Sequence, residues 1–134
     1  MVRFVFLFLF TLTTVTLSAA IAPPEAAAQQ AIQRGRLDAA QKTYEAYRAQ
    51  LASGKVDVDT LYRWSIRWLK AEIATKSNTA AALLAHKTRM NALSDQIGTM
   101  ARNGLASSAD LKAVEYYRVE ADLWSTYNAT YPNK

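Results

Sequence analysis

The chain has 134 residues, which is the size of one domain. It contains no cysteine, so a disulfide framework, a thiolate metal site and covalently attached haem are excluded. Four glycines and three prolines are too few for the many turns of a β-protein, and the net charge of +5 is too common a value to identify an anionic partner.

Residues 1–28 have the pattern of a secretory signal peptide. One arginine is followed by an apolar run and then by small residues. We expect cleavage after Ala28, which leaves a helical domain over residues 29–134. The alternative is an uncleaved membrane anchor, because residues 2–22 approach the roughly 20 residues that span a bilayer. In both cases we expect the folded part to be periplasmic or secreted.

The first predicted helix covers about residues 28–52 and the second about residues 58–75. Gly54 is expected to end the first helix in a left-handed conformation, and Asp57 to cap the second. The apolar stripe of the first helix, in steps of three and four, is Leu37, Ala40, Tyr44, Tyr47 and Leu51. The stripe of the second helix is Leu61, Trp64, Trp68 and Ile73.

The segment Ser77-Asn78-Thr79 is predicted to separate the second helix from a third. If this break is weak, the two helices merge into one rod. The third helix is expected to end before Gly104, and Ser107 with Asp110 resembles a capping box for a fourth helix over about residues 109–127. The third stripe is Leu83, His86, Met90, Leu93, Ile97 and Met100. The fourth is Leu111, Val114, Tyr117, Ala121 and Trp124.

The two halves of the chain repeat each other at a spacing of 50 residues. Ala52-Ser53-Gly54 corresponds to Arg102-Asn103-Gly104, and Lys70-Ala71-Glu72-Ile73 corresponds to Glu120-Ala121-Asp122-Leu123. Helices joined by loops this short lie antiparallel. The sequence therefore predicts an all-α antiparallel bundle of four helices, built from two helical-hairpin repeats. We expect the three tryptophans to pack in its core, the alternative being an exposed aromatic surface.

Three segments carry a family resemblance: 61–72 (LYRWSIRWLKAE), 85–90 (AHKTRM) and 115–124 (EYYRVEADLW). They resemble a class of uncharacterised secreted helical proteins from planctomycete-type bacteria. The glycine turn followed by Ser-Ala-Asp-Leu is also similar to the periplasmic helical repeats of the TolC outer-membrane efflux family. The resemblance covers about residues 36–125. Because the TolC channel also needs barrel strands, it implies at most a helical fragment associated with efflux.

The residue types that carry chemistry do not form a recognisable site. His86 is the only histidine, and we expect it to be a hydrogen-bonded core residue. Met90 lies one turn away on the same helix, so the two cannot hold a haem from opposite faces. The carboxylates Glu72, Glu115, Glu120 and Asp122 are interpreted as surface ion-pair partners, such as Glu115 with Arg118. We predict that the protein is not an enzyme and has no catalytic residue, cofactor or metal.

The strongest functional feature is a basic aromatic stripe on the second helix, formed by Arg63, Trp64, Arg67, Trp68 and Lys70. Such a stripe can dock on an anionic membrane, although a solvated helix face has the same pattern. Two functions therefore remain open. One is a helical interaction or structural protein of the bacterial cell envelope with an unknown partner. The other is an envelope-surface binding module that uses the stripe. We expect no nucleic-acid partner, and a monomer or weak homodimer.

Overall fold

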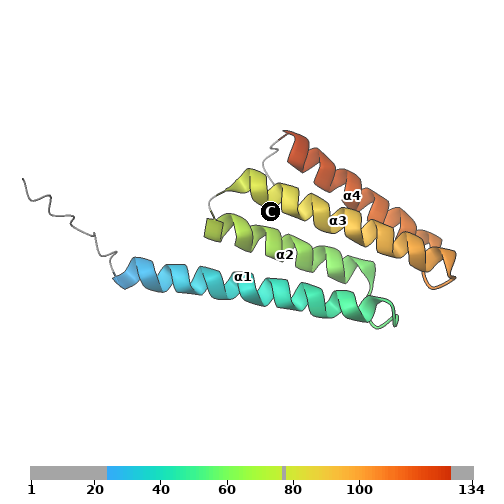
Figure 1. Cartoon of the computed structure of the whole chain (residues 1–134), viewed down its shortest axis with the longest axis horizontal. Helices are drawn as coiled ribbons and strands as arrows, with labels where there is room; N and C mark the ends of the chain where they lie inside the picture. The colour runs from blue at the N-terminus through green and yellow to red at the C-terminus, as the bar shows by residue number, and fades with distance from the viewer. Residues whose placement is uncertain (1–23, 77, 128–134) are drawn as a thin grey trace, which may run out of the picture.

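The structure is a computed structural model, and it describes residues 24–76 and 78–127. The described residues form four helices: α1 (Pro24–Leu51), α2 (Val58–Lys76), α3 (Thr79–Arg102) and α4 (Ser108–Tyr127). They contain no strand. The helices run alternately up and down, so the predicted antiparallel four-helix bundle is confirmed (Figure 1). Most of the predicted signal peptide, residues 1–23, lies outside the described residues.

The helix ends follow the local signals in the sequence. The amide of Thr60 donates to Asp57 Oδ1 at 2.6 Å, which caps α2. Ser107 and Asp110 form the expected capping box, with the Asp110 amide 3.1 Å from Ser107 Oγ and the Ser107 amide 2.8 Å from Asp110 Oδ2. Asn78 caps α3, so α2 and α3 are separate helices and not one rod.

Both glycine stops have the predicted left-handed backbone, with φ of 68° at Gly54 and 73° at Gly104. After α3 the chain forms a Schellman motif: the Leu105 amide donates to the Met100 carbonyl at 2.8 Å and the Gly104 amide to the Ala101 carbonyl at 3.0 Å. The two turns lie at the same end of the bundle (Figure 1).

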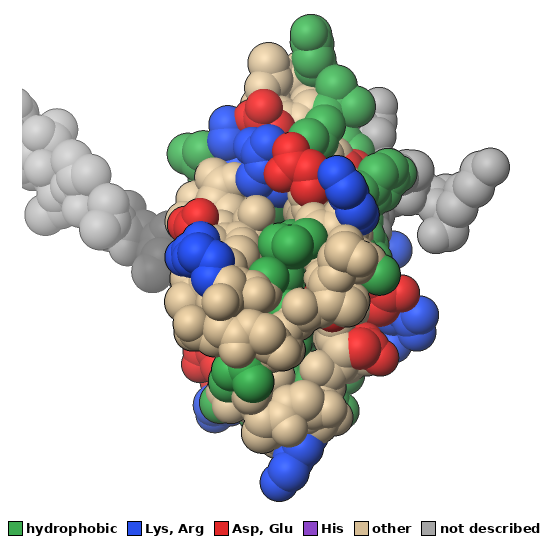
Figure 2. Space-filling model, turned by 90° about the vertical axis from the view of Figure 1, so that its right-hand side faces the viewer, with side chains coloured by type: hydrophobic (Ala, Val, Ile, Leu, Met, Phe, Trp, Pro, Cys, Tyr) green, Lys and Arg blue, Asp and Glu red, His purple; other side chains and the backbone are tan. Residues whose placement is uncertain are grey.

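Helix α2 lies at the centre of the arrangement. The helices pack most extensively within the hairpins α1–α2 and α3–α4, and α2 also contacts α3 and α4. In the described part of the chain, no Cα atom of α1 comes within 8 Å of α3 or α4. Helices α1 and α4 are therefore the outer helices of the bundle. In an end-on view, hydrophobic side chains gather along the top of the molecule, over α4 (Figure 2).

The core confirms the predicted stripe of α3, in which all six members are buried: Leu83, His86, Met90, Leu93, Ile97 and Met100. The stripe predicted for α2 is wrong in part. The fully buried line is Leu61, Ser65 and Leu69, and Trp64 and Trp68 are half-buried beside it. Because α2 is covered by helices on more than one side, a single stripe does not describe its buried surface. Leu111, expected in the α4 stripe, is 37 % exposed.

None of the described helices combines the length and the apolar character needed to cross a membrane.

Candidate functional site

The structure splits the basic aromatic stripe between the surface and the core. Arg63, Arg67 and Lys70 are exposed. The two tryptophans between them turn towards α1, where the Trp64 ring lies 6.2 Å from the Tyr47 ring and the Trp68 ring 5.5 Å from the Tyr44 ring. Both pack against the larger core cluster. The stripe thus presents its cations to solvent, while its aromatic rings hold α1 against α2.

Small side chains leave a shallow hollow beside this stripe, of about 320 Å³. Arg67 borders the hollow with its guanidinium carbon 4.3 Å from the centre of the Trp64 ring, a cation–π distance. Two arginines therefore face a hollow lined largely by alanine methyl groups. Its lining is Arg36, Ala39, Ala40, Trp64, Arg67 and Ala71.

The positive charge of the described protein is concentrated in this half. Residues 24–76 carry nine Lys and Arg against six Asp and Glu, whereas residues 78–127 carry five of each. The α1–α2 hairpin is accordingly basic and the α3–α4 hairpin is neutral.

A buried polar cluster joins α2 to α3. His86 is fully buried, as expected, and its Nδ1 lies 2.9 Å from Ser65 Oγ. Arg89 Nε donates to the same hydroxyl oxygen at 3.2 Å. The hydroxyl oxygen of Ser65 thus lies between the Arg89 guanidinium and the imidazole of His86. Burial, followed by the nearby Arg89 charge, lowers the pKa of His86 from 6.5 to about 3, so the ring is neutral at physiological pH.

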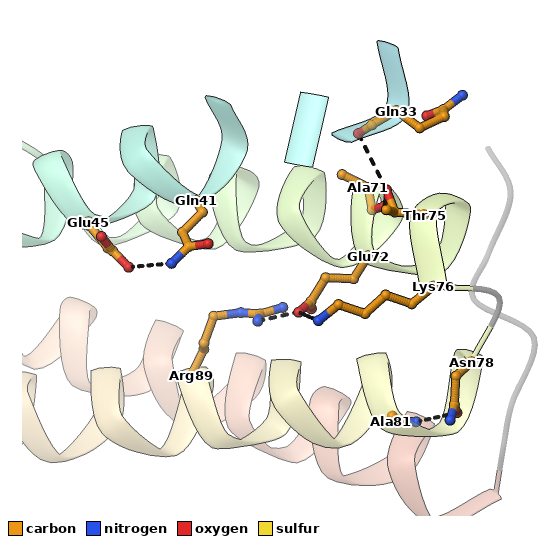
Figure 3. Close-up of polar contacts among 10 residues, drawn as sticks. All are labelled: Gln33, Gln41, Glu45, Ala71, Glu72, Thr75, Lys76, Asn78, Ala81 and Arg89. Atoms are coloured by element: carbon orange, nitrogen blue, oxygen red, sulfur yellow. Dashed lines mark hydrogen bonds and ion pairs between the residues drawn. The ribbon is translucent and has the colours of Figure 1, made fainter. Parts of the chain in front are cut away.

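Arg89 connects this cluster to a buried carboxylate. Its Nη1 lies 3.1 Å from Glu72 Oε2, and Lys76 approaches the other carboxylate oxygen at 3.5 Å (Figure 3). The guanidinium carbon also lies 4.0 Å from the centre of the Trp68 ring. The interpretation of Glu72 as a surface residue is therefore wrong, because its side chain is only 8 % exposed. By contrast, the predicted surface pair of Glu115 with Arg118 is present at 2.7 Å.

The contacts of this cluster hold α2 against α3. Among the described residues, no group of three or more histidines and carboxylates is placed to hold a metal ion. The His86 ring stacks on the Trp124 ring, at 5.6 Å between centroids, and is closed to solvent. Sequence reasoning found His86 but missed Ser65 and Arg89, whose contacts follow from the packing of α2 on α3.

An apolar stripe on the outer face of α4 is the largest feature that the sequence reasoning did not single out. The stripe consists of Tyr116, Val119, Leu123 and Tyr127. These residues are spaced by three, four and four positions, so they lie on one side of the helix. Their exposed fractions are 63 % for Tyr116, 53 % for Val119, 52 % for Leu123 and 71 % for Tyr127. The buried side of the same helix holds Val114, Ala121 and Trp124. A second three-four spacing beside the core stripe was the signal in the sequence that could have revealed it.

The chain matches no protein-family model, no curated protein and no solved structure. The resemblance to secreted planctomycete-type proteins and to TolC repeats therefore stays a prediction.

Proposed function

We propose that this protein is an exported helical interaction protein of the cell envelope, and that it binds a helical partner through the outer face of α4. The observation that carries the proposal is the apolar stripe of Tyr116, Val119, Leu123 and Tyr127, which is more than half exposed at every position. Contiguous exposed apolar residues on a small protein are typical of interaction surfaces.

The spacing of the stripe favours a helix as the partner. Residues three and four apart present a ridge along one side of α4, and such ridges pack into the grooves of a second helix. Fully covering one valine or leucine side chain stabilises a complex by roughly 1.5–3 kcal/mol. The envelope location rests on the signal-peptide pattern of residues 1–28.

Site-specific photocrosslinking in the host tests this function. A photoreactive amino acid at Leu123 is expected to give adducts, because the stripe is covered by a partner. The matched control position is Ile32, which is 63 % exposed on α1 but stands outside the stripe. Absence of adducts from both Leu123 and Tyr116 would rule the proposal out, as would an equal yield from Ile32.

A second function is supported by the charge of the α1–α2 hairpin. Arg63, Arg67 and Lys70 lie exposed on a helix of this basic half, and Arg36 and Arg67 border the hollow beside them. This surface suits an anionic envelope surface, with electrostatic attraction and not aromatic insertion as the binding force. Its test is binding of the protein to anionic and to neutral lipid vesicles.

A further inference from the structure

The 50-residue repeat explains why α4 has an apolar outer face. It aligns Ile66, Leu69 and Ile73 of α2 with positions 116, 119 and 123 of α4. In α2 these three residues belong to the second core cluster, which also contains Leu83 of α3 and Trp124 of α4. Leu69 is fully buried there. These positions are thus among those through which the first hairpin contacts the second.

The alignment holds in three dimensions as well as in sequence. The matched glycines Gly54 and Gly104 share a left-handed backbone, and the matched alanines Ala71 and Ala121 are 2 % and 0 % exposed. The outer positions differ: Leu69 is buried, whereas its counterpart Val119 is 53 % exposed. Helix α3 covers α2, and no described helix covers α4 in the same way. The outer face of α4 therefore has the pattern of a helix-covered surface without its covering helix.

We propose that a second copy of this chain supplies the covering helix, and that the two α4 helices pack antiparallel about a twofold axis near Val119. This inference rests on the proposed function and names its partner. Val119 lies about midway between Tyr116 and Leu123, so the axis would place Tyr116 against Leu123 of the other copy. An interface that uses the same patch on both copies is closed and does not propagate into a filament.

The distribution of exposed apolar residues indicates that α4 of the second copy is the helix that covers the α4 stripe. The large exposed hydrophobic residues of the described chain outside α4 are Ile32, Leu84 and Leu105, one each on α1, α3 and the turn before α4. None of them forms a stripe. A second copy therefore offers one apolar ridge of matching length, which is the outer face of its own α4.

The charges agree with this arrangement. The α3–α4 hairpin is neutral, so joining two copies through α4 keeps their basic α1–α2 hairpins apart. The charges at the edge of the stripe are already paired within the chain, Glu115 with Arg118 and Asp122 with Lys87. From Tyr116 to Tyr127 the ridge is only about 16 Å long at 1.5 Å per residue. We therefore expect a weak dimer that depends on concentration, below the size of a standard stable interface.

Cysteine crosslinking tests the geometry directly, because the natural chain contains no cysteine. In protein purified after export from its host, Val119→Cys is expected to form a disulfide dimer under mild oxidation. Ile32→Cys, equally accessible, is expected to stay monomeric. Tyr116→Cys and Leu123→Cys should crosslink to each other when mixed and poorly to themselves. Strong self-crosslinking of both would overturn the antiparallel arrangement.

Sedimentation over a wide concentration range tests the dimer without a crosslink. The wild-type mass should rise from one chain towards two. We expect Val119→Glu with Leu123→Glu to weaken association at least tenfold and Ile32→Glu to leave it unchanged, with helicity checked by circular dichroism. A wild-type protein that is monomeric throughout overturns the self-pairing, and so does a dimer that survives the double substitution. Photocrosslinking distinguishes a failure of the self-pairing from a failure of the proposed function. An adduct of Leu123 with a different protein would support the proposed function and reject the second copy as the partner.

Discussion

At the scale of single residues, His86 links the stability of the bundle to pH. Its pKa is lowered from 6.5 to about 3 in the folded chain, so between these values the unfolded chain binds one proton more than the folded chain. The free energy of unfolding should therefore fall as the pH falls from about 6.5 towards 3, by roughly 1 kcal/mol per pH unit from this group alone. Above pH 6.5 the contribution is constant.

Urea unfolding at several pH values between 7.5 and 4.5 measures this dependence. Near the lower end of this range the carboxylates with lowered pKa, Asp57, Glu115 and Asp122, begin to add a slope of their own, which any variant at His86 shares with the wild type. The variant His86→Leu has no imidazole to protonate and should lose most of the slope, whatever its stability at pH 7.5. A slope that is the same in the variant and the wild type would contradict the assignment to His86.

The two glycine turns make a second prediction at this scale. A Cβ atom at Gly54 or Gly104 would meet no other atom within 4 Å, so the cost of alanine there is the left-handed backbone alone. We expect Gly54→Ala and Gly104→Ala each to lower the free energy of unfolding by about 1 kcal/mol. Gly35, inside α1 and also in open space, is the matched control. Gly35→Ala should raise stability by roughly 0.5–1 kcal/mol in thermal melts. Equal effects at all three positions would show that φ does not matter.

At the scale of helices, the ends were more predictable than the faces. Caps and glycine stops act within a few residues, so Asp57, Gly104 and the box of Ser107 with Asp110 could be found from the sequence. The stripe of α3 was also predicted in full, because one side of this helix holds its buried residues. The faces of α2 and α4 depend on which helix lies at the centre of the bundle. That order is set by the packing of one hairpin on the other, which the periodicity of a single helix does not contain.

The same dependence on helix packing explains why Glu72 was wrongly predicted to lie on the surface. Glu72 has charged neighbours in sequence and resembles a surface residue, but α3 covers it and Arg89 reaches it from that helix. Its spatial partner lies 17 residues away, on another helix. The outer stripe of α4 was missed for the opposite reason, since an apolar spacing gives no sign of whether a neighbouring helix covers it.

The pair of Glu72 and Arg89 gives a prediction for the contact between α2 and α3. Both side chains are at most 10 % exposed, so removing Glu72 leaves Arg89 as a buried charge without its carboxylate. We expect Glu72→Ala to cost roughly 3–5 kcal/mol of unfolding free energy. The double variant Glu72→Leu with Arg89→Met should recover most of this loss, because it removes both charges and fills the space. Urea denaturation of the single and double variants measures the difference. A double variant that is no more stable than Glu72→Ala would contradict a buried ion pair.

At the scale of the whole molecule, the two hairpins have different surfaces. The first hairpin is basic, and Trp64 and Trp68 pack between its two helices. The second hairpin is neutral and has an apolar outer face. The two hairpins thus share their glycine turns and the buried alanines Ala71 and Ala121, but differ in their exposed surfaces. The two proposed functions use different hairpins, so substitutions on one hairpin should leave binding by the other intact.

Binding to anionic vesicles tests the basic side of the molecule. We expect the exported protein to sediment with vesicles that contain anionic lipid, but not with neutral vesicles, because each basic side chain near such a surface contributes about 1 kcal/mol. The triple variant Arg63→Gln, Arg67→Gln, Lys70→Gln should therefore bind up to roughly 100-fold more weakly. Raising the salt to about 0.5 M should weaken the wild type similarly, since it shortens the screening length.

The control removes the same number of charges from the neutral hairpin, through Arg102→Gln, Lys112→Gln and Arg118→Gln. If position decides binding, this control retains most of the wild-type affinity, because its charges lie on the other hairpin. If net charge decides, both triple variants lose affinity equally, and the stripe of Arg63, Arg67 and Lys70 is then a solvated helix face and not a binding surface. Wild-type binding that persists in high salt would also reject the stripe, since its half-buried tryptophans leave electrostatic attraction as the force available to it.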